Sequence, residues 1–102
     1  MPDNWSKNLG KLIKQKRLEQ ELPLRKVAAE LDIDTSTLSK IEKGERQASL
    51  KMIPIIAKLF NLEYRELQVK FLSEKLVQEY GKEKHFIDTL ENCLDTLQRK
   101  HK

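Results

Sequence analysis

The sequence predicts an all-α fold, and three observations support this prediction. Apolar residues recur every three or four positions through most of the chain, for example at Leu9, Leu12 and Ile13, which is the period of an amphipathic helix. No stretch alternates apolar and polar residues convincingly enough to be a strand. Residues that commonly begin or end helices, such as Asp34 and Gly44, separate the periodic segments. We therefore expect helices joined by short turns.

The first two helices are expected over residues 7–20 and 23–31. Asn4 or Ser6 can cap the first helix, because short polar side chains accept hydrogen bonds from the free amides at a helix start. Pro23 interrupts the first pattern and is well tolerated as the first residue of the second helix.

A third helix, over residues 35–43, follows after a turn of only a few residues. Asp32 stands where the chain must turn, and aspartate tolerates the left-handed conformation better than most residues. Asp34 is a suitable N-cap, and Gly44 is a suitable C-terminal cap. Two short helices joined in this way have the layout of a helix-turn-helix, whose second helix enters the major groove of DNA.

Three further helices complete the predicted fold. The fourth is expected over residues 50–60 with Ser49 as its cap, and the fifth over residues 63–80 with Gly81 after it. The sixth is expected over residues 83–100. A chain of 102 residues supports one compact domain with a small appendage.

The composition favours a cytoplasmic protein with an anionic partner. Lysine and arginine exceed aspartate and glutamate, which gives a net charge of +4, although such an excess is also common on an ordinary soluble surface. The longest apolar runs fall far short of the ~20 residues of a membrane span. The single cysteine, Cys93, excludes an intrachain disulfide framework and suits a reducing compartment.

An enzymatic function is not expected from the available side chains. The histidines are His85 and His101, and on a helix Cys93 lies about 12 Å along the axis from His85, too far for a nucleophile–base pair. These three residues form no recognisable zinc set, and there is no glycine-rich phosphate loop. We expect no catalytic residue, metal or cofactor, and we interpret Cys93 as a small core residue.

The expected third helix has one apolar side and one polar side. At ~100° per residue, Leu38 and Ile41 define the inner side, and small polar or basic side chains lie opposite: Ser36, Ser39, Lys40 and Lys43. Short side chains allow close approach to DNA, and lysines supply donors for guanine edges or phosphates. An ordinary amphipathic helix with a solvated exterior has the same pattern, so the pattern alone leaves both interpretations open.

Residues 27–44 resemble the Cro/C1-type helix-turn-helix family of bacterial and phage regulators, also called the xenobiotic-response-element family. The matching residues are Val27-Ala28, Asp32-Ile33-Asp34 and Ser36-Thr37-Leu38-Ser39-Lys40-Ile41-Glu42-Lys43-Gly44. The match extends from about Leu9 to Leu67. It implies a five-helix DNA-binding domain over residues 1–67. The resemblance does not reach beyond Leu67, and the helical pattern of the remaining residues predicts a C-terminal helical extension over residues 68–102.

The resemblance also implies which residues contact DNA. The family reads bases from the start and outer side of the third helix, here Thr35, Ser36, Ser39 and Lys40, with Asp34 at the edge. It anchors phosphates at positions that correspond to Leu24, Arg25, Lys43 and Arg46. Leu24 departs from the family's usual glutamine and cannot make a side-chain hydrogen bond to phosphate, so Arg25 can substitute for it.

Two further departures from the family pattern concern structure. The family usually has glycine at the position of Asp32 and often proline at the position of Ala48.

The resemblance also implies an ion pair between Arg17 and Glu42. The family commonly pairs an arginine of the first helix with the glutamate that corresponds to Glu42. A contact between Arg17 and phosphate is the alternative.

The C-terminal extension carries two apolar seams of helical spacing. One comprises Val69, Leu72 and Leu76, and the other comprises Ile87, Leu90, Leu94 and Leu97. These helices can pack on each other as a hairpin or pair between two chains. We favour pairing between chains, because specific sites usually consist of two half-sites about one DNA turn apart and because symmetric dimers are the commonest oligomers.

The sequence therefore predicts a DNA-binding transcriptional regulator that recognises a partly palindromic operator as a homodimer. A repressor or a restriction–modification controller is an example. The alternative is an antitoxin-like or adaptor protein whose C-terminal helices chiefly bind another protein.

Overall fold

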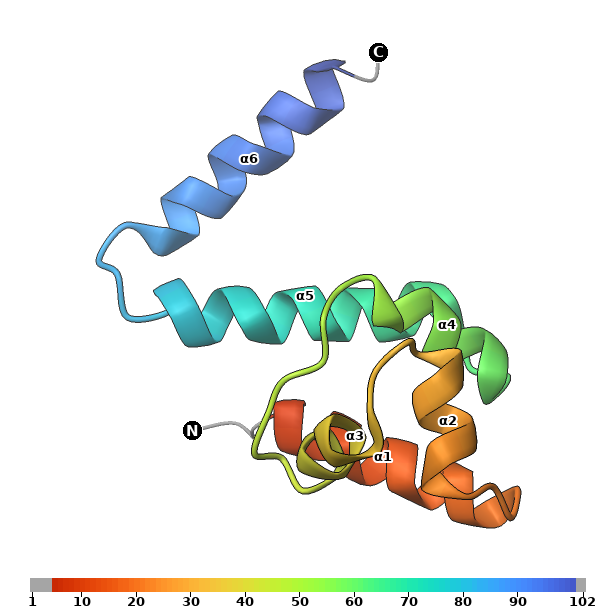
Figure 1. The fold of residues 1–102 in the computed structure, drawn as a ribbon. Helices are drawn as coiled ribbons and strands as arrows, with labels where there is room; N and C mark the ends of the chain where they lie inside the picture. Colours follow the sequence, from red (N-terminus) through yellow and green to blue (C-terminus); the bar gives the residue numbers. More distant parts are fainter. Residues whose placement is uncertain (1–4, 101–102) are drawn as a thin grey trace.

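The computed structural model describes residues 5–100, and these residues form six α-helices and no strand. The helices are α1 (Trp5–Glu19), α2 (Leu24–Glu30), α3 (Thr35–Glu42), α4 (Met52–Leu59), α5 (Tyr64–Tyr80) and α6 (Phe86–Lys100). Helices α1 to α5 gather around one core, whereas α6 extends away from them (Figure 1). The all-α prediction is confirmed.

The core is formed by the inner sides of the first five helices and by the segment before α4. Its buried apolar residues are Leu9, Ile13, Val27, Ala28, Leu31, Leu38, Ile41, Ala48, Met52, Ile53, Ile56, Ala57, Phe60, Leu67 and Phe71. Burial of the side chains larger than alanine stabilises a fold by roughly 1.5–3 kcal/mol each. Because every one of the five helices contributes, the core fixes the position of α3 relative to the others.

Four helices end in a similar way, with a left-handed residue that reverses the chain. The left-handed residues are Glu21, Asp32, Gly44 and Asn61. In the turn between α2 and α3, the amide of Ile33 donates to the carbonyl of Ala28 at 3.0 Å. This is the Schellman arrangement. Asp32 has a φ of 57°, so the predicted left-handed turn is present without glycine.

The helix starts agree less well with the sequence pattern. Ser49 does not cap α4: its hydroxyl is buried without a hydrogen-bond partner, and its carbonyl accepts from the amide of Met52 at 3.0 Å. This short-range turn places Ser49 outside the helix start, which is why the prediction was wrong. Pro23 is the N-cap of α2 and not its first residue. Of the caps predicted for α1, Asn4 lies outside the described residues and Ser6 lies inside the helix.

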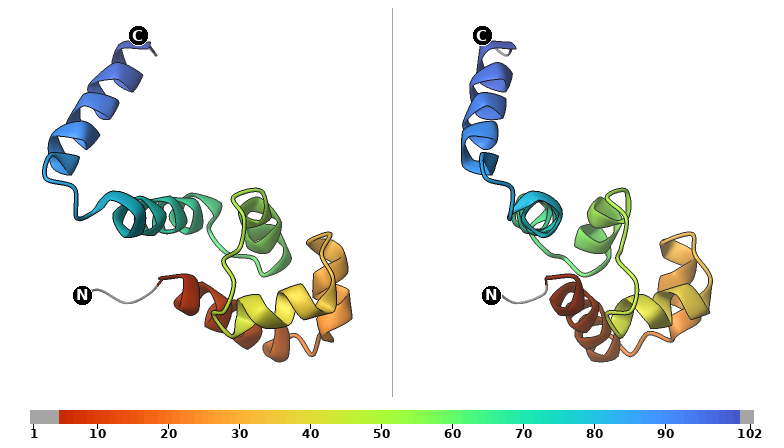
Figure 2. Two further views of the ribbon diagram at one scale, coloured as in Figure 1. Left: turned by 60° about the vertical axis from the view of Figure 1, so that its left-hand side comes forward. Right: turned by 90° about the vertical axis from the view of Figure 1, so that its left-hand side faces the viewer.

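Helix α5 crosses the expected domain boundary after residue 67 without a break. Leu67 and Phe71 are both buried in the core, whereas the second half of the helix is exposed at Leu72 and Leu76. Helix α6 then turns away, and the views in Figures 1 and 2 show that it does not lie alongside α5. The described chain therefore does not form the hairpin that was considered as an alternative.

Helix α6 contains no buried residue. It begins at Phe86, three residues later than predicted, and the Phe86 ring lies 6.2 Å from the ring of Tyr80 at the end of α5. Cys93 is exposed, so its interpretation as a core residue was wrong. The residue is small and apolar enough for a core, but it lines an open pocket between the end of α5 and the start of α6, on a helix that contains no buried residue.

Candidate nucleic-acid interface

The two sides of α3 differ sharply in exposure. Leu38 and Ile41 are 0% and 1% exposed, so the inner side of the helix is sealed against the core. On the outer side, Ser36 and Lys40 are exposed and Ser39 is partly exposed. The helix lies at the end of the molecule opposite the C-terminal end of α6 (Figure 2). The polar ridge of α3 is therefore open to solvent in the described chain.

Asp34 organises the start of α3. Its Oδ1 atom accepts a hydrogen bond from the amide of Thr37 at 2.7 Å and another from the hydroxyl of Ser36 at 3.2 Å. Hydrogen bonds from the Thr37 side chain and backbone lower the pKa of the Asp34 carboxyl, and Ser36 lowers it further. A lowered pKa keeps the cap ionised, which suits the positive end of the helix dipole.

Arg17 and Glu42 form a buried ion pair between α1 and α3. Arg17 Nε lies 2.8 Å from Glu42 Oε2, and Arg17 Nη2 lies 3.1 Å from Glu42 Oε1. Arg17 Nη1 also donates to the carbonyl of Leu22 at 3.0 Å. The residues are only 8% and 7% exposed. The hydrogen bond to Glu42 raises the pKa of Arg17, so the guanidinium stays charged.

This two-pronged pair holds α3 at one rotation about its axis. Bidentate arginine–carboxylate pairs restrict both distance and orientation. Because Glu42 lies near the end of α3, the pair fixes the helix end that is remote from the Asp34 cap. The Arg17 guanidinium is engaged by Glu42 and Leu22, which argues against the alternative in which Arg17 contacts phosphate.

Gly10 allows α1 and α3 to approach each other closely, a role that the sequence pattern did not predict. A Cβ atom at this position would overlap the carbonyl oxygen of Ile41 and lie 3.0 Å from that of Glu42. Gly10 is also buried. The only signal in the sequence was a glycine in the middle of an otherwise regular helical pattern, where glycine normally costs stability.

Gly10→Ala should lower the free energy of unfolding by about 1–3 kcal/mol, because the added methyl group meets backbone that cannot move without displacing α3. The higher helix propensity of alanine, about 1 kcal/mol, is included in that net value. Urea denaturation followed by circular dichroism measures the effect. Lys11→Ala, at an exposed position of the same helix, is the control and should change stability by less than about 0.5 kcal/mol. Equal stability of the two variants would contradict the close approach.

Three cations flank the ridge of α3. Arg25 lies in α2, Lys43 is the C-cap of α3, and Arg46 lies in the following loop; all three are exposed. The hydrogen bonds from Thr37 and Ser36 lower the pKa of Asp34 most, and the positive charge of Arg46 lowers it by a smaller amount. The fold thus brings its charge into the field of the α3 start.

The loop that carries Arg46 is tied to α5. Gln47 Nε2 donates to Gln78 Oε1 at 3.2 Å, and the buried Ala48 inserts into the core. Leu24, the residue that departs from the family pattern, packs against the core. Its backbone remains at the start of α2, but its side chain offers only apolar surface.

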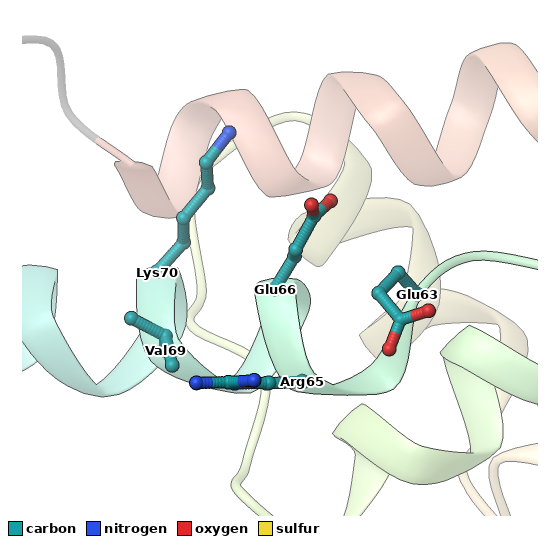
Figure 3. A pocket seen from close by; sticks show the side chains of 5 residues that line it. All are labelled: Glu63, Arg65, Glu66, Val69 and Lys70. Atoms are coloured by element: carbon teal, nitrogen blue, oxygen red, sulfur yellow. The ribbon is translucent and has the colours of Figure 1, made fainter.

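A separate pocket lies along the first half of α5. Its lining residues are Glu63, Arg65, Glu66, Val69 and Lys70, and Figure 3 shows Glu66 and Lys70 extending from α5 towards α1. The pocket includes none of the residues predicted to contact DNA. Its lining contains neither histidine nor cysteine. Acidic and basic side chains alternate along it, which is typical of a solvated depression of the surface.

The described residues contain no group of histidine, cysteine, aspartate or glutamate side chains placed to hold a metal ion. Across residues 5–100, no helix combines the length and apolar character that crossing a bilayer requires.

Comparison with known proteins adds two similarities. A family model described as helix-turn-helix matches residues 13–67. The chain is also 39% identical over 75 residues to a protein of Bacillus phage phi105 described as "ImmF control region 10 kDa protein", and the match covers 74% of this chain and 81% of the phage protein. No solved structure matches the chain.

Proposed function

The chain belongs to the Cro/C1-type helix-turn-helix family of DNA-binding transcriptional regulators, and from this premise we propose that it binds a partly palindromic operator as a homodimer. The observation that carries the proposal is the exposed polar ridge of α3, set on a helix whose opposite side is sealed in the core. The similarity to a phage protein named for a control region supports a role in gene regulation.

Base recognition is assigned to the outer side of α3. Thr35, Ser36, Ser39 and Lys40 carry hydroxyl and ammonium groups that can bond to base edges in the major groove. A lysine favours guanine, which presents two acceptors there. Asp34 lies at the edge of this set, and its carboxylate is already used to cap the helix, so we assign it mainly a positioning role.

Phosphate contacts are assigned to Arg25, Lys43 and Arg46. Such contacts fix the protein on the duplex without reading its sequence. The three residues come from α2, from the end of α3 and from the loop after it. They therefore bracket the ridge that reads the bases, as a backbone clamp around a recognition helix requires.

Dimerisation is assigned to the apolar residues of α5 and α6 that lie outside the core. They are Val69, Leu72, Leu76, Ile87, Leu90, Leu94 and Leu97, and each is at least 37% exposed. A run of exposed apolar side chains of this kind marks a protein interface more often than a free surface. Two copies would supply the two recognition helices that a palindromic operator needs.

Lys40→Ala and Arg46→Ala are expected to weaken DNA binding in different ways. Loss of a base contact should cost about 1–3 kcal/mol on the preferred duplex and relax the base preference, whereas loss of a phosphate contact should weaken binding evenly across sequences. Fluorescence anisotropy with a specific and a random duplex measures both effects. Lys58→Ala, an exposed lysine of α4, is the matched control. Equal losses on both duplexes for both variants would contradict these roles.

The uncovered helix α6 also supports a second candidate function. An antitoxin-like or adaptor protein would use the same apolar residues to bind a different protein. Purification of the full chain from its native source separates the two candidates, since a stoichiometric second protein supports the adaptor and a lone dimer supports the regulator.

A further inference from the structure

The apolar seam of α6 is formed by Ile87, Leu90, Leu94 and Leu97, and no other segment of the described chain buries it. These side chains are 40–74% exposed, and the helix contributes nothing to the core. A helix of 15 residues is marginal in water by itself, because packing of an apolar face supplies most helix stability. A partner that buried this seam would therefore stabilise the helix.

We propose that this seam is covered by the same seam of a second copy, with the two α6 helices parallel. The inference rests on the proposed homodimer and adds the orientation of its subunits. The seam residues recur at intervals of three, four and three, which is the a/d spacing of a coiled coil. Ile87 and Leu94 then take the a positions, and Leu90 and Leu97 take the d positions. The first pair, isoleucine at a with leucine at d, is the combination that favours two-stranded parallel pairing.

The charges on the two flanks of the seam argue against the antiparallel alternative. One flank carries Glu91 and Gln98, with Asp88 and Asp95 behind it, and the other carries Phe86, Cys93 and Lys100. Asp95 is paired with Arg99 of the same helix at 3.1 Å, so Glu91 is the charge that faces the partner. In an antiparallel pair each flank faces its own copy, so Glu91 would lie near the Glu91 of the second copy. Like charges in such positions are destabilising. In a parallel pair the acidic flank instead faces the flank that contains no acidic residue.

The position of α3 supports the same orientation. Figures 1 and 2 show that α6 leads away from the end of the molecule at which α3 lies. A two-fold axis along parallel α6 helices would place both α3 helices at the same end of the dimer, where one duplex can contact both. A two-fold axis perpendicular to α6 would place them at opposite ends.

Cysteine cross-linking of the full-length chain tests the orientation. In a parallel pair, the two copies of residue 97 lie at the same height on the seam, so Cys93→Ser/Leu97→Cys should form a disulfide dimer when oxidised with copper phenanthroline. In an antiparallel pair with all four seam residues aligned, these two positions are about 15 Å apart along the axis, too far for a disulfide. The native Cys93 would then lie next to its own copy near the two-fold axis.

The expected result is cross-linking of most Cys93→Ser/Leu97→Cys chains and little cross-linking of the wild type. Cys93→Ser/Asn92→Cys is the matched control, because residue 92 lies opposite the seam. These substitutions fall on exposed positions, so the helix-turn-helix core should stay folded, and circular dichroism checks this.

Four results would overturn the inference. Cross-linking of native Cys93, without cross-linking at residue 97, would indicate antiparallel helices. Equal cross-linking of all three proteins, or none in a protein that sediments as a dimer, would exclude the α6 seam as the paired surface while leaving the homodimer intact. Sedimentation as a monomer at micromolar concentration would refute the proposed homodimer itself, and with it the parallel pairing.

Discussion

Arg17→Ala is expected to lower the free energy of unfolding by about 3–5 kcal/mol, because it leaves the Glu42 carboxylate buried without its partner. The two side chains are 10% and 5% exposed, and Arg17 Nε lies 2.8 Å from Glu42 Oε2. Water therefore cannot readily solvate the carboxylate that the substitution leaves without its partner. A small domain is stable by only about 5–15 kcal/mol. The variant should therefore be partly unfolded in moderate urea, as followed by circular dichroism.

A double replacement separates the buried charge from the packing. Arg17→Met/Glu42→Leu removes both charges and keeps apolar volume, and it should recover most of the loss, because a buried pair can often be replaced by apolar residues at little cost. The double variant should fold. If the ion pair sets the rotation of α3, the double variant should nevertheless bind DNA more weakly than the wild type. A loss below about 1 kcal/mol for Arg17→Ala would mean that the pair is solvated and does not anchor α3.

The affinity for a specific duplex is expected to fall about 1000-fold between 50 and 200 mM salt. The proposed dimer places Arg25, Lys43 and Arg46 of both chains on phosphates, which makes six contacts from three exposed cations per chain. Each contact releases condensed counterions, so the logarithm of the affinity should fall with the logarithm of salt with a slope of about −5. Titration by fluorescence anisotropy at four salt concentrations measures this slope.

Arg46→Ala should make this slope shallower by about two units, one for each chain of the dimer. Arg65→Ala removes an exposed arginine of α5, outside the proposed interface, and should leave the slope unchanged. An unchanged slope for Arg46→Ala, or the same reduction in both variants, would show that binding is a diffuse attraction to net positive charge.

The sequence was sufficient to predict the helices and the helix-turn-helix unit. Local chemistry explains this success: Asp34 and Gly44 mark the ends of α3, and Asp32 allows the left-handed turn before it. The inner side of α3 followed from the helical period at Leu38 and Ile41. Such signals act over a few residues, so they are visible without knowledge of the tertiary structure.

The features that the sequence did not reveal depend on what packs against what. The role of Gly10 appears only when α3 lies against it, and the unpaired hydroxyl of Ser49 only when a turn displaces the start of α4. Cys93 has the composition of a core residue but lies on a helix that leaves the core. The pattern of α6 showed an apolar seam, yet it did not show that the seam stays exposed in the described chain.

Selection of bound duplexes from a random pool tests the central claim most directly. Wild-type protein should enrich an inverted repeat whose half-sites are centred about 10 base pairs apart, or a multiple of that spacing. A triple variant with alanine at Ser36, Ser39 and Lys40 should remain folded and enrich no sequence. Enrichment of the same repeat by this variant, or no enrichment by the wild type, would contradict recognition of DNA by the outer side of α3.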